Sequence, residues 1–517
     1  MTRQIFAFCL LCWPASVMAQ APSVDTGPLS VIDWLGEQPK TAPRKPKGPI
    51  SPGEAPVAQT ALPPKVTVTV LGEGSPRAIG LVPAKVTGLP QDLWSASTVS
   101  DITDRLDHMP DLHLPAARAL FYRLLLAEAI APAGRAAEGD ALALARVQAL
   151  VDNGAVDPAL SLIEQAGVAT SSDHFALWMQ VSLLVGTEDR ACALLTQKPY
   201  LTSDYSVRIF CAARAGNWDT AALTFGSAQA LQLLPPERLA LLDRFLNPDL
   251  FEGEPGLPMP RTMDAMGFRL FEAIGERPQT RSLPPAFAVV DLRDVAGWKA
   301  QLEAAERLTR LGALPDNRFL GIYSDRAPAA SGGIWDRVAA LQRFDTALNT
   351  GSAEAVAKTL RPAWTAMQEA ELEVSFATLF AEPLQAIPLE GAAAALRDRI
   401  SLLSPIYESV GSVNDQNTEA AFLAAIATGT APKSIPDMRH ADAIASAFIT
   451  PSPRAILITE AQNGKLGMSI LATIALLEDG ANGDTAALRD ALSTLRALGM
   501  EDIARRAALQ VLLLERS

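Results

Sequence analysis

The chain has 517 residues, of which 49% are hydrophobic and 20% are charged, and its formal net charge is −13 at pH 7. This length is sufficient for several domains or for one long repeat array. The acidic balance argues against nucleic acid as a partner and against general binding to anionic lipid.

Residues 1–19 have the pattern of a signal peptide. Arg3 precedes an apolar stretch from Ile5 to Trp13, and Val17-Met18-Ala19 is typical of a signal-peptidase site. The apolar stretch is too short to span a bilayer, and no later segment has about 20 uninterrupted apolar residues. We therefore expect a periplasmic protein without a membrane span in the mature chain, which would begin at Gln20. An intact mass that still includes Met1 would contradict this expectation.

Residues 20–65 contain ten prolines, which predicts an extended, disordered linker. The positive charges of the linker gather between Lys40 and Lys47. We interpret this segment as a solvated linker, with weak binding to an anionic surface as the alternative. The linker also carries a short helical motif at 29–36, with Ser30 and Asp33 as a capping box and Gly36 at its end. The large apolar residues of this motif form a candidate partner-binding cluster: Leu29, Val31, Ile32, Trp34 and Leu35.

A helix of so few turns is not stable alone and has to dock on another surface. It could dock on its own protein, but the long linker favours a partner in the cell envelope, bound as a helix in a groove. We expect Trp34→Ala to abolish partner capture and to leave the melting temperature unchanged. A clear fall in melting temperature would show instead that the motif belongs to the protein's own fold.

A small β or irregular cap is predicted at 66–114. Val66, Val68 and Val70 alternate with threonines, which is typical of a strand, and the segment from 80 to 94 is apolar without a regular hydrophobic period. From 115 to 246 the period is helical. Gly154, Gly186 and Gly216 end successive helices and are 32 and 30 residues apart, a spacing typical of helix-turn-helix repeats of tetratricopeptide size. We therefore predict a mainly α fold, an α-solenoid of stacked helix pairs that is tetratricopeptide-like without a strict repeat signature.

A Pro/Gly-rich crossing is predicted at 247–290, a middle helical region at 291–430 and C-terminal repeats at 431–517, where the repeat phrase returns more loosely. The middle region is dense in aromatic and arginine residues, which are enriched at binding hot spots but also at helix junctions. These residues form a candidate interaction surface: Trp298, Arg307, Asn317, Tyr323, Arg326, Trp335, Asp336 and Arg337.

Cys192 and Cys211 are the only cysteines after residue 19, so an oxidising compartment favours a disulfide between them over two buried thiols. The four histidines show no metal-ligand spacing, and no nucleophile or phosphate-binding motif is complete. Glu408-Ser409 resembles the catalytic pair of some lytic transglycosylases, but the Gly-Leu-Met-Gln stretch that should follow is absent. The sequence therefore predicts no catalytic residue, cofactor or metal.

Three segments resemble an uncharacterised family of periplasmic, α-helical repeat proteins from alphaproteobacteria, some of which carry an "antifreeze" label. These segments are LSVIDWL in the linker, GWKAQLEAAERLTRLGALPDNR from Gly297 and RAPAASGGIWDR from Arg326. The resemblance covers nearly the whole chain and implies no activity, because none is established for that family.

Together these features favour a non-catalytic periplasmic scaffold or adaptor that binds protein partners. Two alternatives remain open. One is a regulator of peptidoglycan synthesis or hydrolysis enzymes, and the other is a degenerate cell-wall lytic enzyme centred on Glu408.

Overall fold

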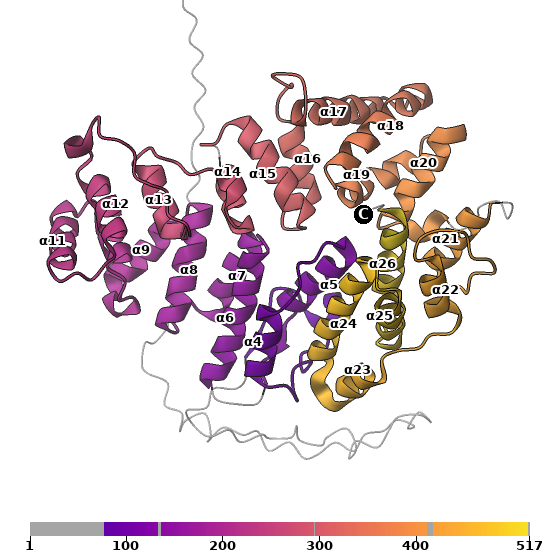
Figure 1. Cartoon of the computed structure of the whole chain (residues 1–517), viewed down its shortest axis with the longest axis horizontal. Coiled ribbons are helices and arrows are strands. Elements are labelled where there is room, and N and C mark those ends of the chain that lie inside the picture. The colour runs from indigo at the N-terminus through magenta and orange to yellow at the C-terminus, as the bar shows by residue number, and fades with distance from the viewer. Residues whose placement is uncertain (1–76, 133–135, 294, 411–416, 515–517) are drawn as a thin grey trace, which may run out of the picture. The chain divides into compact units, whose positions relative to one another are not determined.

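The computed structural model describes residues 77–132, 136–293, 295–410 and 417–514, which all belong to one compact unit. The chain within these ranges is mainly helical, as predicted (Figure 1). The motif at 29–36 and the strand expected at 66–70 lie outside the described residues. None of the described helices combines the length and apolar character that a bilayer span requires.

The cap segment holds little regular structure. Strand β1 (Ala78–Ile79) pairs antiparallel with β2 (Ala129–Ile130), and the segment also contains two short helices, α3 (Ala84–Thr87) and α4 (Val99–Asp107). Trp94 is buried here against Gly467, where a Cβ atom would lie only 2.2 Å from the indole ring. The cap thus packs directly on the C-terminal part of the chain.

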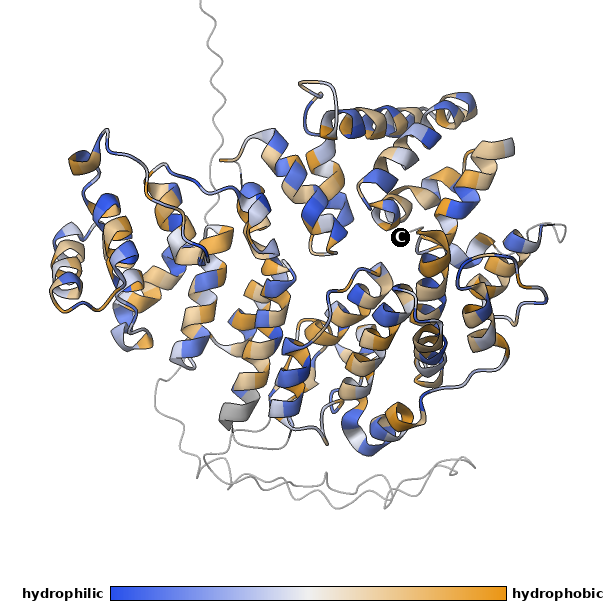
Figure 2. Cartoon of the chain, in the orientation of Figure 1, coloured by the Kyte–Doolittle hydropathy of each residue, from blue (hydrophilic) through white to orange (hydrophobic). Residues whose placement is uncertain are grey.

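The predicted helix corners are present. Gly154, Gly186 and Gly216 all have positive φ, at 79°, 84° and 77°, a conformation that glycine adopts without strain. Gly154 lies between α6 (Ala136–Asp152) and α7 (Val156–Ala166), and Gly186 lies between α8 (Ser172–Val185) and α9 (Glu188–Gln197). Gly216 lies between α10 (Tyr205–Arg214) and α11 (Trp218–Ala230), which is followed by α12 (Pro236–Leu246). From α6 to α12, each helix packs on the next one in the sequence. Figure 2 shows polar and apolar residues alternating along these helices, as expected where one side is buried.

Acidic residues lie in the first turn of two of these helices. Asp157 follows the start of α7 at Val156, and Asp219 follows the start of α11 at Trp218. A carboxylate in the first turn still interacts favourably with the positive end of the helix dipole.

The segment 247–290, predicted as a Pro/Gly-rich crossing, contains regular structure. Helix α13 (Ala265–Ala273) buries Phe268, Leu270 and Phe271, and α14 (Ala288–Asp291) follows after short 3-10 turns. The spacing of the hydrophobic residues therefore determines the local secondary structure, despite the surrounding prolines and glycines.

A cluster of charges binds this crossing to the helical array. Arg269 of α13 donates to both Glu188 of α9 and Glu272, and Arg293 donates to Glu272 at 2.7 and 2.8 Å. Burial alone would raise the pKa of Glu272, but the hydrogen bonds from Arg293 and Arg269 outweigh it and lower that pKa. The Glu272 carboxylate is therefore held in its charged form.

The rest of the described chain continues as helices. In order, these are α15 (Trp298–Arg310), α16 (Asp316–Ser324), α17 (Ile334–Thr350), α18 (Ala353–Glu369), α19 (Glu373–Gln385), α20 (Gly391–Leu402), α21 (Thr418–Thr428), α22 (Ala441–Ile449), α23 (Ala455–Glu460), α24 (Leu466–Ala481), α25 (Thr485–Ala497) and α26 (Glu501–Leu513). Gly480 lies inside α24, where a Cβ atom would come within 2.6 Å of the Leu488 Cα atom. Only glycine permits this close approach of α24 and α25.

The first long helix of the described chain packs against the last ones. Helix α5 (Pro115–Leu126) contacts both α24 and α26. The Glu478 carboxylate accepts from the backbone N–H groups of His113 and Leu114 at 2.8 and 3.2 Å. The Gln510 side chain accepts from Ala116 N–H at 2.7 Å. Side chains from the C-terminal helices therefore supply the N-terminal cap that the sequence of α5 lacks.

Cys192 of α9 and Cys211 of α10 form a disulfide, with their Cα atoms 5.0 Å apart. This confirms the predicted pairing.

We expect Cys192→Ala/Cys211→Ala to lower the free energy of unfolding by about 3 kcal/mol, because the bond closes a loop of about 20 residues in the unfolded chain. Urea unfolding of the double variant and of the oxidised wild type would measure the difference. Reduced wild type serves as the control and should match the variant. Equal stability of oxidised and reduced wild type would contradict the prediction.

Candidate binding groove

An open groove lies on the surface formed by helices α17, α18 and α20. Aromatic packing sets the positions of the helices beneath it, because Phe344 of α17 lies 5.2 Å from both Phe376 and Phe380 of α19. Trp364 of α18 packs edge-on against Phe376 at 5.7 Å. Gly351, with φ of 69°, makes the turn between α17 and α18. The walls of the groove are therefore anchored in the buried core.

The groove has a volume of about 720 Å³ and a largely small, apolar floor. Its apolar lining comprises Ala340, Ala357, Leu360, Pro362, Ala366, Ala392, Ala393 and Leu396. Side chains this small leave room for another molecule between the helices. We call this channel the α17–α20 groove.

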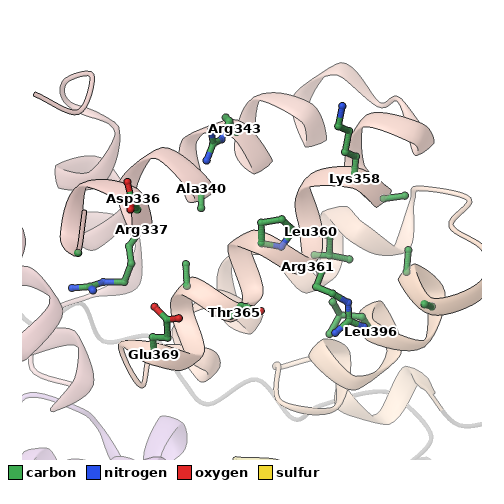
Figure 3. Close-up of a pocket in the computed structure, with 16 residues that line it drawn as sticks. Asp336, Arg337, Ala340, Arg343, Lys358, Leu360, Arg361, Thr365, Glu369 and Leu396 are labelled. Atoms are coloured by element: carbon green, nitrogen blue, oxygen red, sulfur yellow. The ribbon is translucent and has the colours of Figure 1, made fainter. Parts of the chain in front are cut away.

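Cations line one part of this groove. Arg343 reaches from α17 toward α18, Lys358 lies near the start of α18, and Arg361 lies beside Leu396 of α20 (Figure 3). All three cations are exposed. Asp336 and Glu369 lie at the opposite end of the groove from Lys358 (Figure 3). The groove is therefore charged asymmetrically along its length.

The fourth cation of the groove, Arg337, is already engaged. It donates to both carboxylate oxygens of Glu306 at 2.8 Å, and that carboxylate also accepts from the Tyr323 hydroxyl at 2.5 Å. Burial and the Glu306 charge raise the pKa of Tyr323, so the phenol stays protonated and acts as a donor. The charge of Arg337 is therefore balanced by Glu306 and contributes little to binding a ligand.

Pro362 changes the backbone of the groove wall. It lies inside α18 and has no N–H group to donate to the carbonyl of Lys358, four residues earlier. Both residues line the groove. The Lys358 carbonyl therefore lacks the donor that residue i+4 supplies in an uninterrupted helix.

A second cavity of about 590 Å³ adjoins the first, since Arg361, Ala392 and Leu396 line both. Its lining is richer in large apolar side chains, among them Trp364, Leu402, Leu423 and Leu513. Asp398, Arg399 and Glu419 also line this cavity, so Arg361 lies at the junction of two compartments that both carry charged side chains.

The predicted interaction surface divides into internal and exposed residues. The rings of Trp298 and Trp335 lie 5.3 Å apart, and the Trp298 indole donates to the Ile322 carbonyl at 3.0 Å. Arg307 donates to the carbonyls of Thr280 and Leu283 at 3.0 and 2.7 Å.

Arg307 thus connects α15 to the 3-10 turn at Thr280–Ser282, whereas the two tryptophans, Tyr323 and Arg337 hold α15, α16 and α17 together. Asn317 and Arg326 are exposed outside the groove, and Asp336 is exposed within it. A role in partner binding stays a prediction for these three residues.

Glu408, the carboxylate of the lytic-enzyme alternative, is held in an ion pair. Its Oε1 accepts from Arg505 Nη1 at 2.5 Å, while 62% of the side chain is exposed. Arg505 is also bound to Glu501 and to the Ala427 carbonyl. The Glu408 carboxylate is therefore largely exposed and engaged by a side chain of the protein itself.

We expect Glu408→Gln to leave peptidoglycan cleavage in a zymogram unchanged from wild type, because neither protein should show any. The loss of this exposed ion pair should lower the free energy of unfolding by less than about 1 kcal/mol. Cleavage by wild type that disappears in the variant would refute the non-catalytic interpretation.

Two of the histidines make side-chain contacts within the fold. His113 Nδ1 lies 3.1 Å from Glu478, and the buried His174 bonds Ser171 in the first turn of α8. In the part of the chain that the structure describes, no group of three or more His, Cys, Asp or Glu side chains is placed to hold a metal ion.

The sequence reasoning missed Arg343, Lys358 and Arg361. Lys358 and Arg361 are three residues apart and hence on one helix face, and Pro362 beside them is unusual in a helix interior. That combination was the available signal, but it could not show that Arg343 of the preceding helix lies across from them. The chain matches no known family model, no curated protein and no solved structure.

Proposed function

We propose that this protein is a periplasmic helical-repeat adaptor without catalytic activity, and that it binds a segment of a partner protein in the α17–α20 groove. The observation that carries the proposal is the groove itself, an open channel with a floor of small residues and three exposed cations. Concave surfaces between stacked helices are extended docking sites in repeat proteins.

A tetratricopeptide-like α-solenoid is the architecture that this proposal assumes. Three corner glycines with positive φ, 32 and 30 residues apart, support it, as does the packing of consecutive helices from α6 to α12. Repeat units of this kind bury their apolar faces only against their neighbours, which leaves the outer faces free for binding.

Two features support the proposed compartment. The signal-peptide pattern of residues 1–19 favours export, and the disulfide between Cys192 and Cys211 suits an oxidising environment. Partners would accordingly be proteins of the cell envelope. Enzymes of peptidoglycan synthesis or hydrolysis are one such class, and the lytic-enzyme alternative is disfavoured by the ion pair of Glu408 with Arg505.

Site-specific photocrosslinking in cells tests the proposal. A crosslinking amino acid at Thr365, which lines the groove, should give discrete protein adducts, whereas the same residue at Thr346 should give none. Thr346 is a matched control because it is exposed and lies on α17 but does not line the groove.

A blocking substitution supplies a second test. Ala392 is exposed and lines both cavities, so Ala392→Trp should fill their junction and abolish the Thr365 adducts. Ala230→Trp on α11 is the control, because Ala230 is exposed and remote from the groove lining. Equal adducts at Thr365 and Thr346, or adducts that persist in Ala392→Trp, would overturn the proposed site.

A further inference from the structure

We infer that the α17–α20 groove recognises an acidic peptide segment in an extended conformation, with acidic side chains over Arg343, Lys358 and Arg361 and a large apolar side chain in the adjoining cavity. This inference rests on the proposed function and adds the chemistry of the partner.

The positive charge in part of the groove favours a negatively charged ligand. The chain as a whole carries −13, yet three exposed cations line this one channel. The carboxylates of the lining lie at the other end, and Arg337 is neutralised by Glu306. A ligand that lies across α17 and α18 near Lys358 therefore meets net positive charge. Such complementarity attracts acidic segments and repels basic ones.

The backbone of the groove favours a peptide over a small anion. The carbonyl of Lys358 lacks the donor that position 362 would supply in an ordinary helix, because that position is proline. A peptide backbone carries N–H donors that can satisfy this acceptor. Free phosphate consists mainly of acceptor oxygens, so the same carbonyl would oppose it.

The adjoining cavity supplies an apolar anchor. Trp364, Leu402 and Leu423 line the apolar part of this mixed cavity, and Arg361 lies at its junction with the α17–α20 groove. Each residue of an extended peptide adds about 3.3 Å, so residues that are near one another in its sequence can reach both the α17–α20 groove and the adjoining cavity. Burial of one large apolar side chain then adds affinity to the charge contacts.

Fluorescence anisotropy with the full mature chain tests this inference. The probe is a fluorescein-labelled peptide of alternating glutamate and leucine, about twelve residues long, and its lysine–leucine counterpart is the comparison. We expect the glutamate peptide to bind in a salt-sensitive manner and the lysine peptide not to bind. Inorganic phosphate at millimolar concentration should not displace the glutamate peptide.

Charge neutralisation locates the binding site. Arg343→Gln/Lys358→Gln/Arg361→Gln should weaken binding of the glutamate peptide by about tenfold or more. Lys85→Gln/Lys433→Gln/Arg439→Gln changes the net charge equally at exposed positions outside both cavities and should bind as wild type does.

Each contrary result has a distinct meaning. Thr365 adducts in cells without binding of the glutamate peptide would leave the adaptor function standing and overturn the acidic chemistry. Equal binding of both peptides, displacement by phosphate, or equal losses in the two triple variants would overturn it as well. Self-association of the wild type that disappears in the groove variant would assign the groove to a second copy of this chain, and would also overturn the inference.

Discussion

Replacing Arg146 with leucine is expected to lower the free energy of unfolding by about 4 kcal/mol, the sum of three backbone acceptors left unpaired in the interior. Arg146 is only 2% exposed, and its guanidinium donates to the carbonyls of Leu125, Ala127 and Ile79 at 2.8, 2.6 and 2.9 Å. Burial lowers its pKa to about 10, so the side chain remains charged at neutral pH. A cation at these carbonyls also complements the negative end of helix α5.

Urea unfolding, followed by circular dichroism, would measure this loss. Arg146→Lys is the informative intermediate, because an ammonium keeps the charge but cannot reproduce the planar fork that reaches three carbonyls. Arg123→Leu, at an exposed position on α5, should change stability by no more than about 0.5 kcal/mol. A loss below about 1 kcal/mol for Arg146→Leu would mean that water satisfies the carbonyls after substitution.

The features that could be predicted from the sequence are those encoded locally. Gly154, Gly186 and Gly216 mark helix corners because positive φ is a property of the single residue. The pairing of Cys192 and Cys211 could be predicted because they are the only cysteines after residue 19. In both cases, a few residues carry the whole signal.

The features that could not be predicted depend on packing between distant segments. Arg146 reads as an ordinary helix residue, and only the fold brings it to the end of α5 and to β1. The pairing of Glu478 with His113 spans 365 positions of sequence. In the aromatic and arginine-rich stretch, Trp298 and Tyr323 suit a binding surface and a helix junction equally well by residue type, and only their burial tells the two apart.

Both walls of the α17–α20 groove are linked to helix α5 through neighbouring helices. On the α18 side, Arg310 of α15 donates to the Ala370 carbonyl at the end of α18, and Arg118 of α5 donates to the Arg310 carbonyl. On the α20 side, Arg399 donates to the Leu513 carbonyl of α26, which packs on α5. These links hold the walls in place before a ligand arrives, which reduces the entropy that binding has to overcome.

The start of α5 is therefore a second position where a single substitution should have a large effect. We expect Glu478→Gln to lower the free energy of unfolding by about 2–3 kcal/mol. Only 1% of the Glu478 side chain is exposed, and its two oxygens accept the N–H groups of His113 and Leu114. Glutamine keeps one acceptor oxygen but turns an N–H donor toward the second backbone N–H, and it removes the negative charge at the positive end of the helix.

Hydrogen exchange would locate this effect, because the amides at the start of α5 and along the facing part of α24 should exchange faster in Glu478→Gln than in wild type. His113→Ala is the matched control. The His113 side chain is 67% exposed, and its backbone N–H, the stronger partner of Glu478 at 2.8 Å, remains after substitution. This variant should lose less than about 1 kcal/mol. An equal loss in both variants would show that the imidazole, and not the capping of α5 by the carboxylate, holds α5 and α24 together.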